Sequence, residues 1–126
     1  MSRHNKDLGD FGEYIAYKLL KKKKYKITAM NFRARQGEID IIAENKEWLV
    51  FVEVKTRKGK EFGNAAEAVD YKKQAHMRSA AGEYISKNPT DKEIRFDVIE
   101  VYASLNDGIY SLEETNHIEN IIMEVM

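Results

Sequence analysis

Three charged residues interrupt two neighbouring apolar segments, where a charge is costly unless it is paired or bound to a metal. Asp40 breaks an isoleucine-rich run, and after twelve intervening residues Glu53 and Lys55 break a second apolar run. Converging carboxylates suit a hard divalent cation such as Mg²⁺, and a nearby lysine suits the orientation of a water that attacks a phosphate. This D…ExK spacing is typical of metal-dependent nucleases. The alternative is a buried Glu53–Lys55 ion pair, with Asp40 serving a turn.

The segments that must position these residues are two predicted strands. Residues 38–44 and 48–56 are rich in β-branched side chains, and the short segment 45–47 joins them as a hairpin. The second strand carries hydrophobic residues on both faces, as a central strand covered on both sides does.

The register of this hairpin decides whether the two carboxylates meet. If the turn is centred on Lys46, Asp40 lies opposite Val52, and Glu53 is a diagonal neighbour on the other face. If the turn is centred between Lys46 and Glu47, Asp40 lies directly opposite Glu53, and both carboxylates share a face. The sequence leaves both registers open.

A third carboxylate belongs to a predicted helix over residues 7–24. Its apolar positions fall on one stripe, formed by Leu8, Phe11, Ile15 and Leu19. Glu13 lies at the margin of that stripe, beside Gly12 and Ala16. These small neighbours let the helix approach a sheet closely, so that Glu13 points toward it.

The chain reads as one α/β domain over residues 1–126, with a mixed sheet flanked by helices in the order α-β-β-β-α-β-β-α. A long helix between two strands suits a crossover that connects parallel strands. The remaining predicted elements are a strand at 26–32, a helix at 65–87, strands at 94–102 and 108–112, and a helix at 118–125.

Composition narrows the function classes. The 126 residues contain no cysteine, which excludes disulfides, thiolate nucleophiles and cysteine-bound metals. No apolar run approaches the roughly 20 residues that span a bilayer, so we expect no membrane insertion. The first residues do not resemble a signal peptide, and we expect a cytoplasmic protein.

The formal net charge of zero hides an uneven distribution. Residues 1–80 carry 18 basic and 11 acidic side chains, whereas residues 81–126 carry 3 and 10, giving net charges of +7 and −7. Such asymmetry indicates a surface for a polyanion, or acidic and basic elements that neutralise each other in the fold.

From residue 9 to residue 101 the sequence resembles the YraN family of small bacterial proteins, which has a restriction-endonuclease-like, Holliday-junction-resolvase-like fold. The matching stretches include Gly12-Glu13, Gly37-Glu38-Ile39-Asp40, Phe51-Val52-Glu53-Val54-Lys55-Thr56-Arg57, Phe62-Gly63, Lys73-Gln74 and Arg95-Phe96-Asp97-Val98-Ile99. The resemblance implies a nuclease-type site formed by Glu13, Asp40, Glu53 and Lys55.

Further residues are expected to serve this site. Lys73 matches the family's lysine–glutamine pair, and it independently falls within the apolar stripe of the helix at 65–87, between Val69 and Met77. Phosphate contacts are expected from Arg33, Arg35, Arg57, Lys58, Lys60, Lys72 and Gln74. We interpret Arg95 and Asp97, which alternate onto one strand face, as a structural ion pair.

The preferred hypothesis is an endonuclease that uses Mg²⁺ or Mn²⁺ on branched or duplex DNA, and a homodimer suits so short a chain. The expected metal ligands are Asp40, Glu53, the Val54 carbonyl and Glu13. One alternative is a non-catalytic nucleic-acid-binding or adaptor domain. Another is a structural protein whose acidic end docks on a protein partner through Glu113, Glu114, Glu119 and Glu124.

Overall fold

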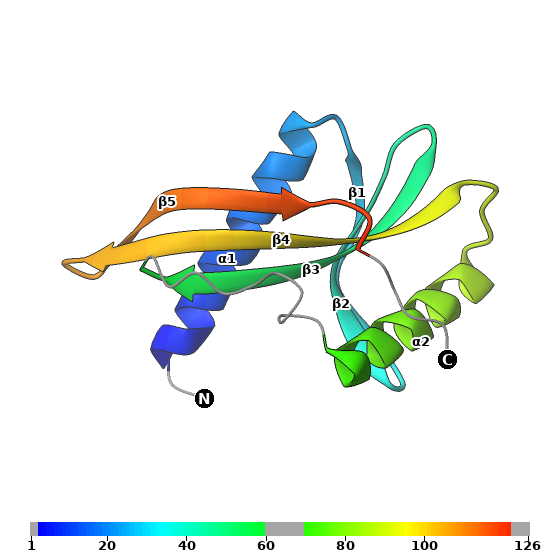
Figure 1. Ribbon diagram of the computed structural model, residues 1–126, viewed down its shortest axis with the longest axis horizontal. Helices are drawn as coiled ribbons and strands as arrows, with labels where there is room; N and C mark the ends of the chain where they lie inside the picture. Colours follow the sequence, from blue (N-terminus) through cyan, green and yellow to red (C-terminus); the bar gives the residue numbers. More distant parts are fainter. Residues whose placement is uncertain (1–2, 60–69, 122–126) are drawn as a thin grey trace.

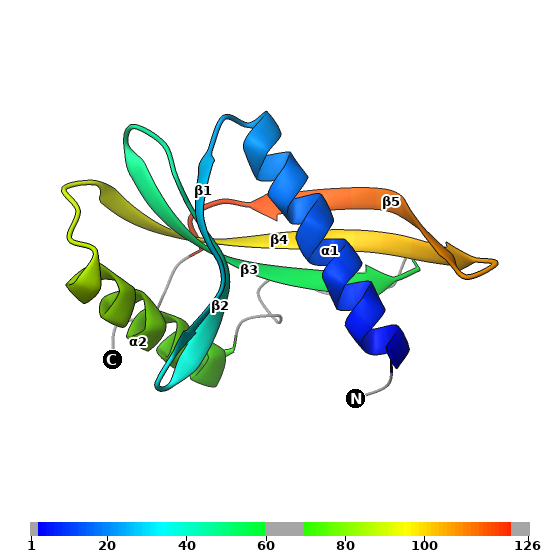
Figure 2. The ribbon, with the colours of Figure 1, turned by 180° about the vertical axis from the view of Figure 1, so that it is seen from behind.

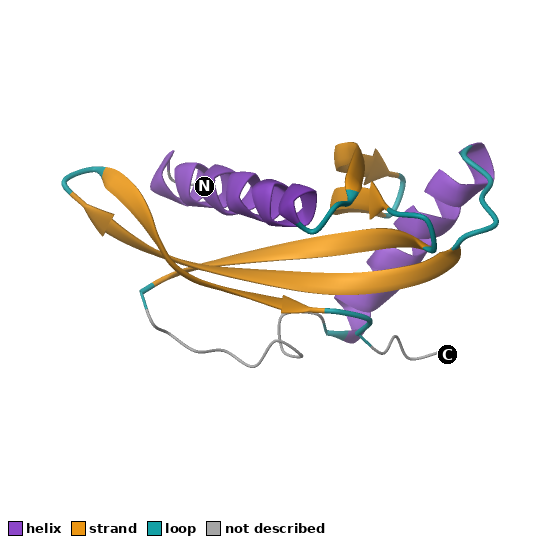
Figure 3. Ribbon diagram, turned by 90° about the horizontal axis from the view of Figure 1, so that it is seen from above, coloured by secondary structure: helices purple, strands orange, loops and turns teal. Residues whose placement is uncertain are grey.

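Strands rich in β-branched residues lie side by side in the order β1-β2-β3-β4-β5 in the computed structural model, which describes residues 3–59 and 70–121. The helix α1 covers one face of this sheet, and α2 packs on the other face at one end (Figures 1–3). The elements are α1 (Arg3–Lys22), β1 (Lys26–Ala34), β2 (Gly37–Glu44), β3 (Trp48–Lys58), α2 (Tyr71–Lys87), β4 (Glu93–Asn106) and β5 (Ile109–Ile118).

The sheet is mixed, as the sequence predicts. The pairs β1–β2, β2–β3 and β4–β5 are antiparallel, whereas β3 and β4 run parallel in a long ladder from Trp48 and Glu93 to Lys58 and Ala103. Two parallel neighbours require a crossover connection, and α2 lies between them in the chain. The predicted crossover is therefore confirmed.

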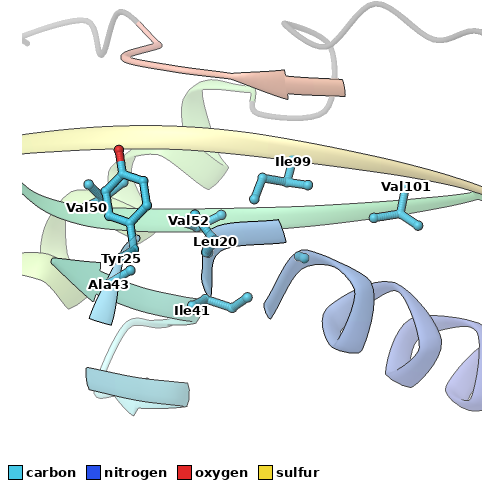
Figure 4. Packing of buried hydrophobic residues seen from close by; sticks show 9 residues of the cluster. Leu20, Tyr25, Ile41, Ala43, Val50, Val52, Ile99 and Val101 are labelled. Carbon is cyan, nitrogen blue, oxygen red and sulfur yellow. The ribbon is translucent and has the colours of Figure 1, made fainter. Parts of the chain in front are cut away.

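Each sheet face carries its own hydrophobic core. On the α1 side, Ala16, Leu20 and Tyr25 pack against strand residues that include Ile41, Ala43, Val50, Val52, Ile99 and Val101 (Figure 4). On the α2 side, the core consists of Ile39, Ile42, Leu49, Phe51, Met77, Ala80, Ala81 and Val98. The central strand β3 contributes alternate residues to both cores, which explains why hydrophobic residues occupy both of its faces.

Two predicted elements differ from the structure at the end of the chain. The edge strand β5 extends over Ile109–Ile118 rather than ending at residue 112. Its polar residues weaken the strand pattern, but backbone pairing to the long β4 keeps them extended. The helix predicted for 118–125 does not begin at Ile118, which ends β5, and residues 122–126 lie outside the described residues. Residues 65–69, the start of the helix predicted at 65–87, also lie outside the described residues.

No helix among the described residues is long and apolar enough to cross a membrane.

Gly12 lets α1 approach β3. A Cβ atom added to Gly12 would lie 1.8 Å from Thr56 Oγ1 and 2.8 Å from Thr56 Cβ, both on β3. The helix therefore packs at a distance that only glycine permits, and this close packing brings the neighbouring Glu13 to the sheet. A similar contact occurs at Gly37, whose added Cβ would lie 2.8 Å from His76 Cβ on α2.

We predict opposite effects for two alanine substitutions in α1. Gly12→Ala should destabilise the protein by about 1–3 kcal/mol, because α1 must move away from Thr56. Gly9→Ala should stabilise it by up to about 1 kcal/mol, since alanine favours the helix and nothing lies within 4 Å of the added Cβ. Urea denaturation of both variants measures the difference. Equal effects would contradict the close approach.

Candidate metal and phosphate site

The β2–β3 ladder ends where the candidate site begins. The last paired residues are Ile41 and Val52. In this register Asp40 lies opposite Glu53 rather than opposite Val52. Of the two registers left open by the sequence, the structure therefore has the one centred between Lys46 and Glu47. Instead of a backbone pair, the Asp40 carboxylate accepts a hydrogen bond of 2.8 Å from the Val54 backbone N–H.

Glu53 is the most buried acid of this group. Its residue is 7% exposed, and Oε1 forms an ion pair of 3.0 Å with Lys73 Nζ. The other oxygen, Oε2, is buried and has no hydrogen-bond donor in the described part of the chain. Burial, together with the charge of Asp40, raises the pKa of Glu53 to about 7.

Burial also raises the pKa values of the other two acids, Asp40 and Glu13. Burial raises the pKa of Asp40, although the hydrogen bond from Val54 N–H and the charge of Lys73 oppose this rise. Burial also raises the pKa of Glu13, a hydrogen bond from Asn31 lowers it, and the charge of Asp40 raises it. The charge of Asp40 thus acts on Glu13 across the space between α1 and the sheet. Asn31 was not identified from the sequence; its backbone has φ 52°, in the left-handed region.

The N-terminus of α2 places Lys73 beside these acids. Asp70 caps the helix, and its side chain accepts a hydrogen bond of 2.8 Å from Lys73 N–H. Burial alone would lower the pKa of Lys73, but the charge of Glu53 and their hydrogen bond give a net rise. This ion pair holds the Lys73 amino group beside Glu53.

Lys55 shares the site but has a different environment. It is exposed, and no described residue pairs with it. Lys55 lines a cavity of about 360 Å³, which opens between β3 and the start of α2. The other lining residues are Glu53, Asp70, Lys72, Lys73 and His76. The cavity thus combines a buried acid with three lysines, the combination that a metal ion and a phosphate require.

The remaining predicted phosphate contacts are distributed over several places. Lys72 lines the same cavity, whereas Arg33 and Arg35 lie near the β1–β2 turn and pair with Glu38 at 3.8 Å and Glu83 at 3.6 Å. Further along β3 lie Arg57 and the exposed Lys58. Gln74 lies on α2, next to Lys73, and Lys60 lies outside the described residues.

The oxygen ligands of this site fit a divalent cation. Asp40 and Glu53 supply carboxylate oxygens, and Glu53 Oε2 is a buried acceptor without a donor among the described residues. Ligand atoms of Glu13, Asp40 and Glu53 do not all lie within 4.8 Å of one another, so Glu13 is a more distant carboxylate of this site. In an extended strand the N–H and C=O groups of one residue point to the same edge, so the Val54 carbonyl faces Asp40 as its N–H does. A hard cation that prefers oxygen, such as Mg²⁺ or Mn²⁺, would satisfy these groups.

A second group of acids lies close together on β4 and β5 but has a different character. Ligand atoms of Asp97, His117 and Glu119 lie within 4.8 Å of one another. Arg95 forms hydrogen bonds of 2.9 Å to both Asp97 oxygens and an ion pair of 3.2 Å with Glu119. Its guanidinium therefore pairs with both carboxylates of this cluster, and the predicted Arg95–Asp97 ion pair is confirmed.

Comparison with known proteins gives a consistent family relation. The model of the "uncharacterised protein family UPF0102" matches residues 12–101. A UPF0102 protein of Caldanaerobacter subterraneus subsp. tengcongensis is 48% identical over 118 residues, covering 93% of this chain and 95% of its own length. A UPF0102 protein of Alkaliphilus oremlandii is 46% identical over 119 residues, covering 92% and 97%. One from Clostridium acetobutylicum is 45% identical over 114 residues, covering 90% and 93%.

We predict that the free energy of unfolding of the metal-free protein falls as the pH rises from about 4.5 to about 7. Over this range Glu53 ionises in the unfolded chain, whereas burial keeps it protonated in the folded protein until its pKa of about 7. Glu53→Gln should remove up to about 3 kcal/mol of this pH dependence. Urea denaturation at several pH values measures it.

The control for this prediction is Glu47→Gln, which neutralises an exposed carboxylate in the β2–β3 turn. It should keep the wild-type dependence on pH. If Glu53→Gln and Glu47→Gln give the same profile, Glu53 does not have the raised pKa.

Proposed function

The chain belongs to the uncharacterised protein family UPF0102, the YraN family of the sequence analysis, and we propose that it is a DNA endonuclease dependent on Mg²⁺ or Mn²⁺. One observation carries this proposal: Glu53, whose Oε2 is buried without a donor in the described part of the chain, lines a cavity together with three lysines, and the strand register sets Asp40 beside it. A lone buried acid would suit many roles. Two adjacent acids beside Lys55 and Lys72, which pair with no described residue, suit phosphodiester hydrolysis.

The residues of the site divide this work between them. Asp40, Glu53 and the Val54 carbonyl would hold the cation, and Glu13 would complete its ligands directly or through water. When bound, the cation would polarise the phosphate and lower the pKa of a bound water. Lys55, which no described residue pairs with, would orient the attacking water and offset the charge that develops on the phosphate. Lys73 would hold Glu53 in place through their ion pair.

The proposed substrate is branched or duplex DNA recognised mainly by its shape. The cations near the cavity contact phosphates, which carry no base sequence. A homodimer would extend a surface that is small in one chain, and the proposal places the protein in the cytoplasm, together with DNA. The alternative, a binding or adaptor domain without catalysis, shares these features and differs only in the absence of cleavage.

The direct test incubates the purified chain with labelled branched, duplex and single-stranded DNA in the presence of Mg²⁺ or Mn²⁺. We expect cleavage by the wild type and a loss of at least about 100-fold in rate for Asp40→Asn and for Glu53→Gln. The control Glu47→Gln should cleave like the wild type, and thermal melting should show that all variants are folded.

Two other outcomes would overturn the proposal. Cleavage that both substitutions leave unchanged would place the reaction elsewhere or in a contaminant. Salt-sensitive DNA binding without any cleavage would support the non-catalytic binding domain instead.

Substitutions of Lys55 and Lys73 should affect cleavage differently. Lys55→Gln should lower the cleavage rate by about 100-fold at every Mg²⁺ concentration, because its charge acts on the phosphate. Lys73→Gln should instead raise the Mg²⁺ concentration needed for half-maximal rate by about tenfold, because Glu53 loses the partner that positions it. Rates measured across a Mg²⁺ titration separate the two effects. Identical titration curves for both variants would contradict these roles.

A further inference from the structure

A buried carboxylate lies on the same sheet face as the site, beyond the N-terminus of α2. Glu100 on β4 is only 1% exposed, and both of its oxygens have partners. Asn116 Nδ2 donates to Oε1 at 3.1 Å, while Tyr102 Oη and Arg57 Nε donate to Oε2 at 3.2 and 3.4 Å. A charge this deeply buried persists because three donors from three strands satisfy it.

Arg57 uses only one of its three guanidinium nitrogens, Nε, in its hydrogen bond to Glu100. Its side chain is 21% exposed, and it uses the inner Nε for Glu100. The two terminal nitrogens contact no described residue, and a guanidinium presents its donors as a flat fork. The fork is therefore fixed at its base and open at its tip.

The position of Arg57 relates it to the candidate site. Glu53, Lys55 and Arg57 alternate along β3 and therefore point to one face, on which Glu53 meets Lys73. Arg57 lies four positions after Glu53, which is about 13 Å along a strand. Figure 1 shows that β3 and β4 extend well beyond α2 here, and Figure 2 shows α1 on the opposite face.

We propose that Arg57 binds a second phosphate of the same DNA strand, and that Glu100 with Tyr102 and Asn116 positions its guanidinium for this contact. The inference rests on the proposed function, because it takes the scissile phosphate to lie at Asp40 and Glu53. A planar fork matches two oxygens of a phosphate, which a lysine does not. The second phosphate lies within about four nucleotides of the first, given one charge per roughly 3.4 Å along a strand.

The test measures binding to DNA in which one phosphate at a time is replaced by a neutral methylphosphonate. Ca²⁺ replaces Mg²⁺ so that the DNA remains intact during the measurement. For the wild type, replacement at one position near the scissile bond should weaken binding by about tenfold. For Arg57→Gln the same replacement should have no further effect, and the slope of log affinity against log salt should fall by about 0.9.

Variants of the partners separate positioning from stability. Glu100→Gln should reduce the effect of the methylphosphonate at that one position, and it should add nothing in an Arg57→Gln background. Arg57→Lys, which keeps the charge but not the fork, should retain part of the effect. Lys87→Gln, an exposed cation at the far end of α2, is the charge-matched control and should behave like the wild type.

The outcomes also distinguish this inference from the proposed endonuclease. If Arg57→Gln lowers the melting temperature but keeps the position effect, the Arg57–Glu100 pair is only structural and the inference is wrong. DNA cleavage without any such position effect also contradicts it, while the endonuclease stands. A position effect that depends on Arg57 in a protein that never cleaves DNA supports the phosphate contact and refutes the endonuclease. The absence of DNA binding by the wild type overturns the inference.

Discussion

The site depends on one local event, the end of the β2–β3 ladder after Ile41 and Val52. At that point the Asp40 carboxylate accepts the hydrogen bond from Val54 N–H, in place of a backbone carbonyl of β2. The edge of β3 therefore has no backbone partner on β2 beyond Val52, but the Val54 N–H still has an acceptor. A buried backbone N–H needs such an acceptor. Glu13 from α1 and Lys73 from α2 reach this edge from opposite faces of the sheet, so one interrupted ladder brings three elements to the same place.

Burial of the acids makes this arrangement costly in the absence of a cation. Asp40 and Glu53 share one close lysine, so that with both acids ionised a negative charge remains unbalanced. The fold can lower the cost by binding a proton, which the pKa of about 7 for Glu53 reflects, or by binding a metal. The Arg95–Asp97 cluster differs, because Arg95, His117 and the Asn120 N–H occupy the Asp97 oxygens and the Glu119 side chain is 54% exposed. This contrast is the physical reason to propose metal binding at the first group of acids rather than at the second.

Much of this organisation could be predicted from the sequence, and the exceptions have physical causes. The apolar alternation predicts β2 and β3. It does not decide between the two possible registers, because their turn centres differ by only half a residue. The side chain of Asn45 accepts hydrogen bonds from the N–H groups of Glu47 and Trp48, and this turn accompanies the observed register. Glu100 was not identified because a single charge in an apolar strand reveals neither its partners nor its depth. Those partners, Asn116 and Arg57, come from distant parts of the chain.

Two ion pairs balance part of the charge asymmetry of the sequence within the fold. Arg57–Glu100 and Arg35–Glu83 each join a cation of the basic first part to an acid of the acidic second part. Neutralisation across the fold, one of the two readings of the asymmetry, thus accounts for several charges. Lys55 and Lys72 differ, because both line the cavity beside Glu53 and no described residue pairs with either. A neutral protein can therefore attract a polyanion at one place, because the local cations rather than the net charge set the interaction.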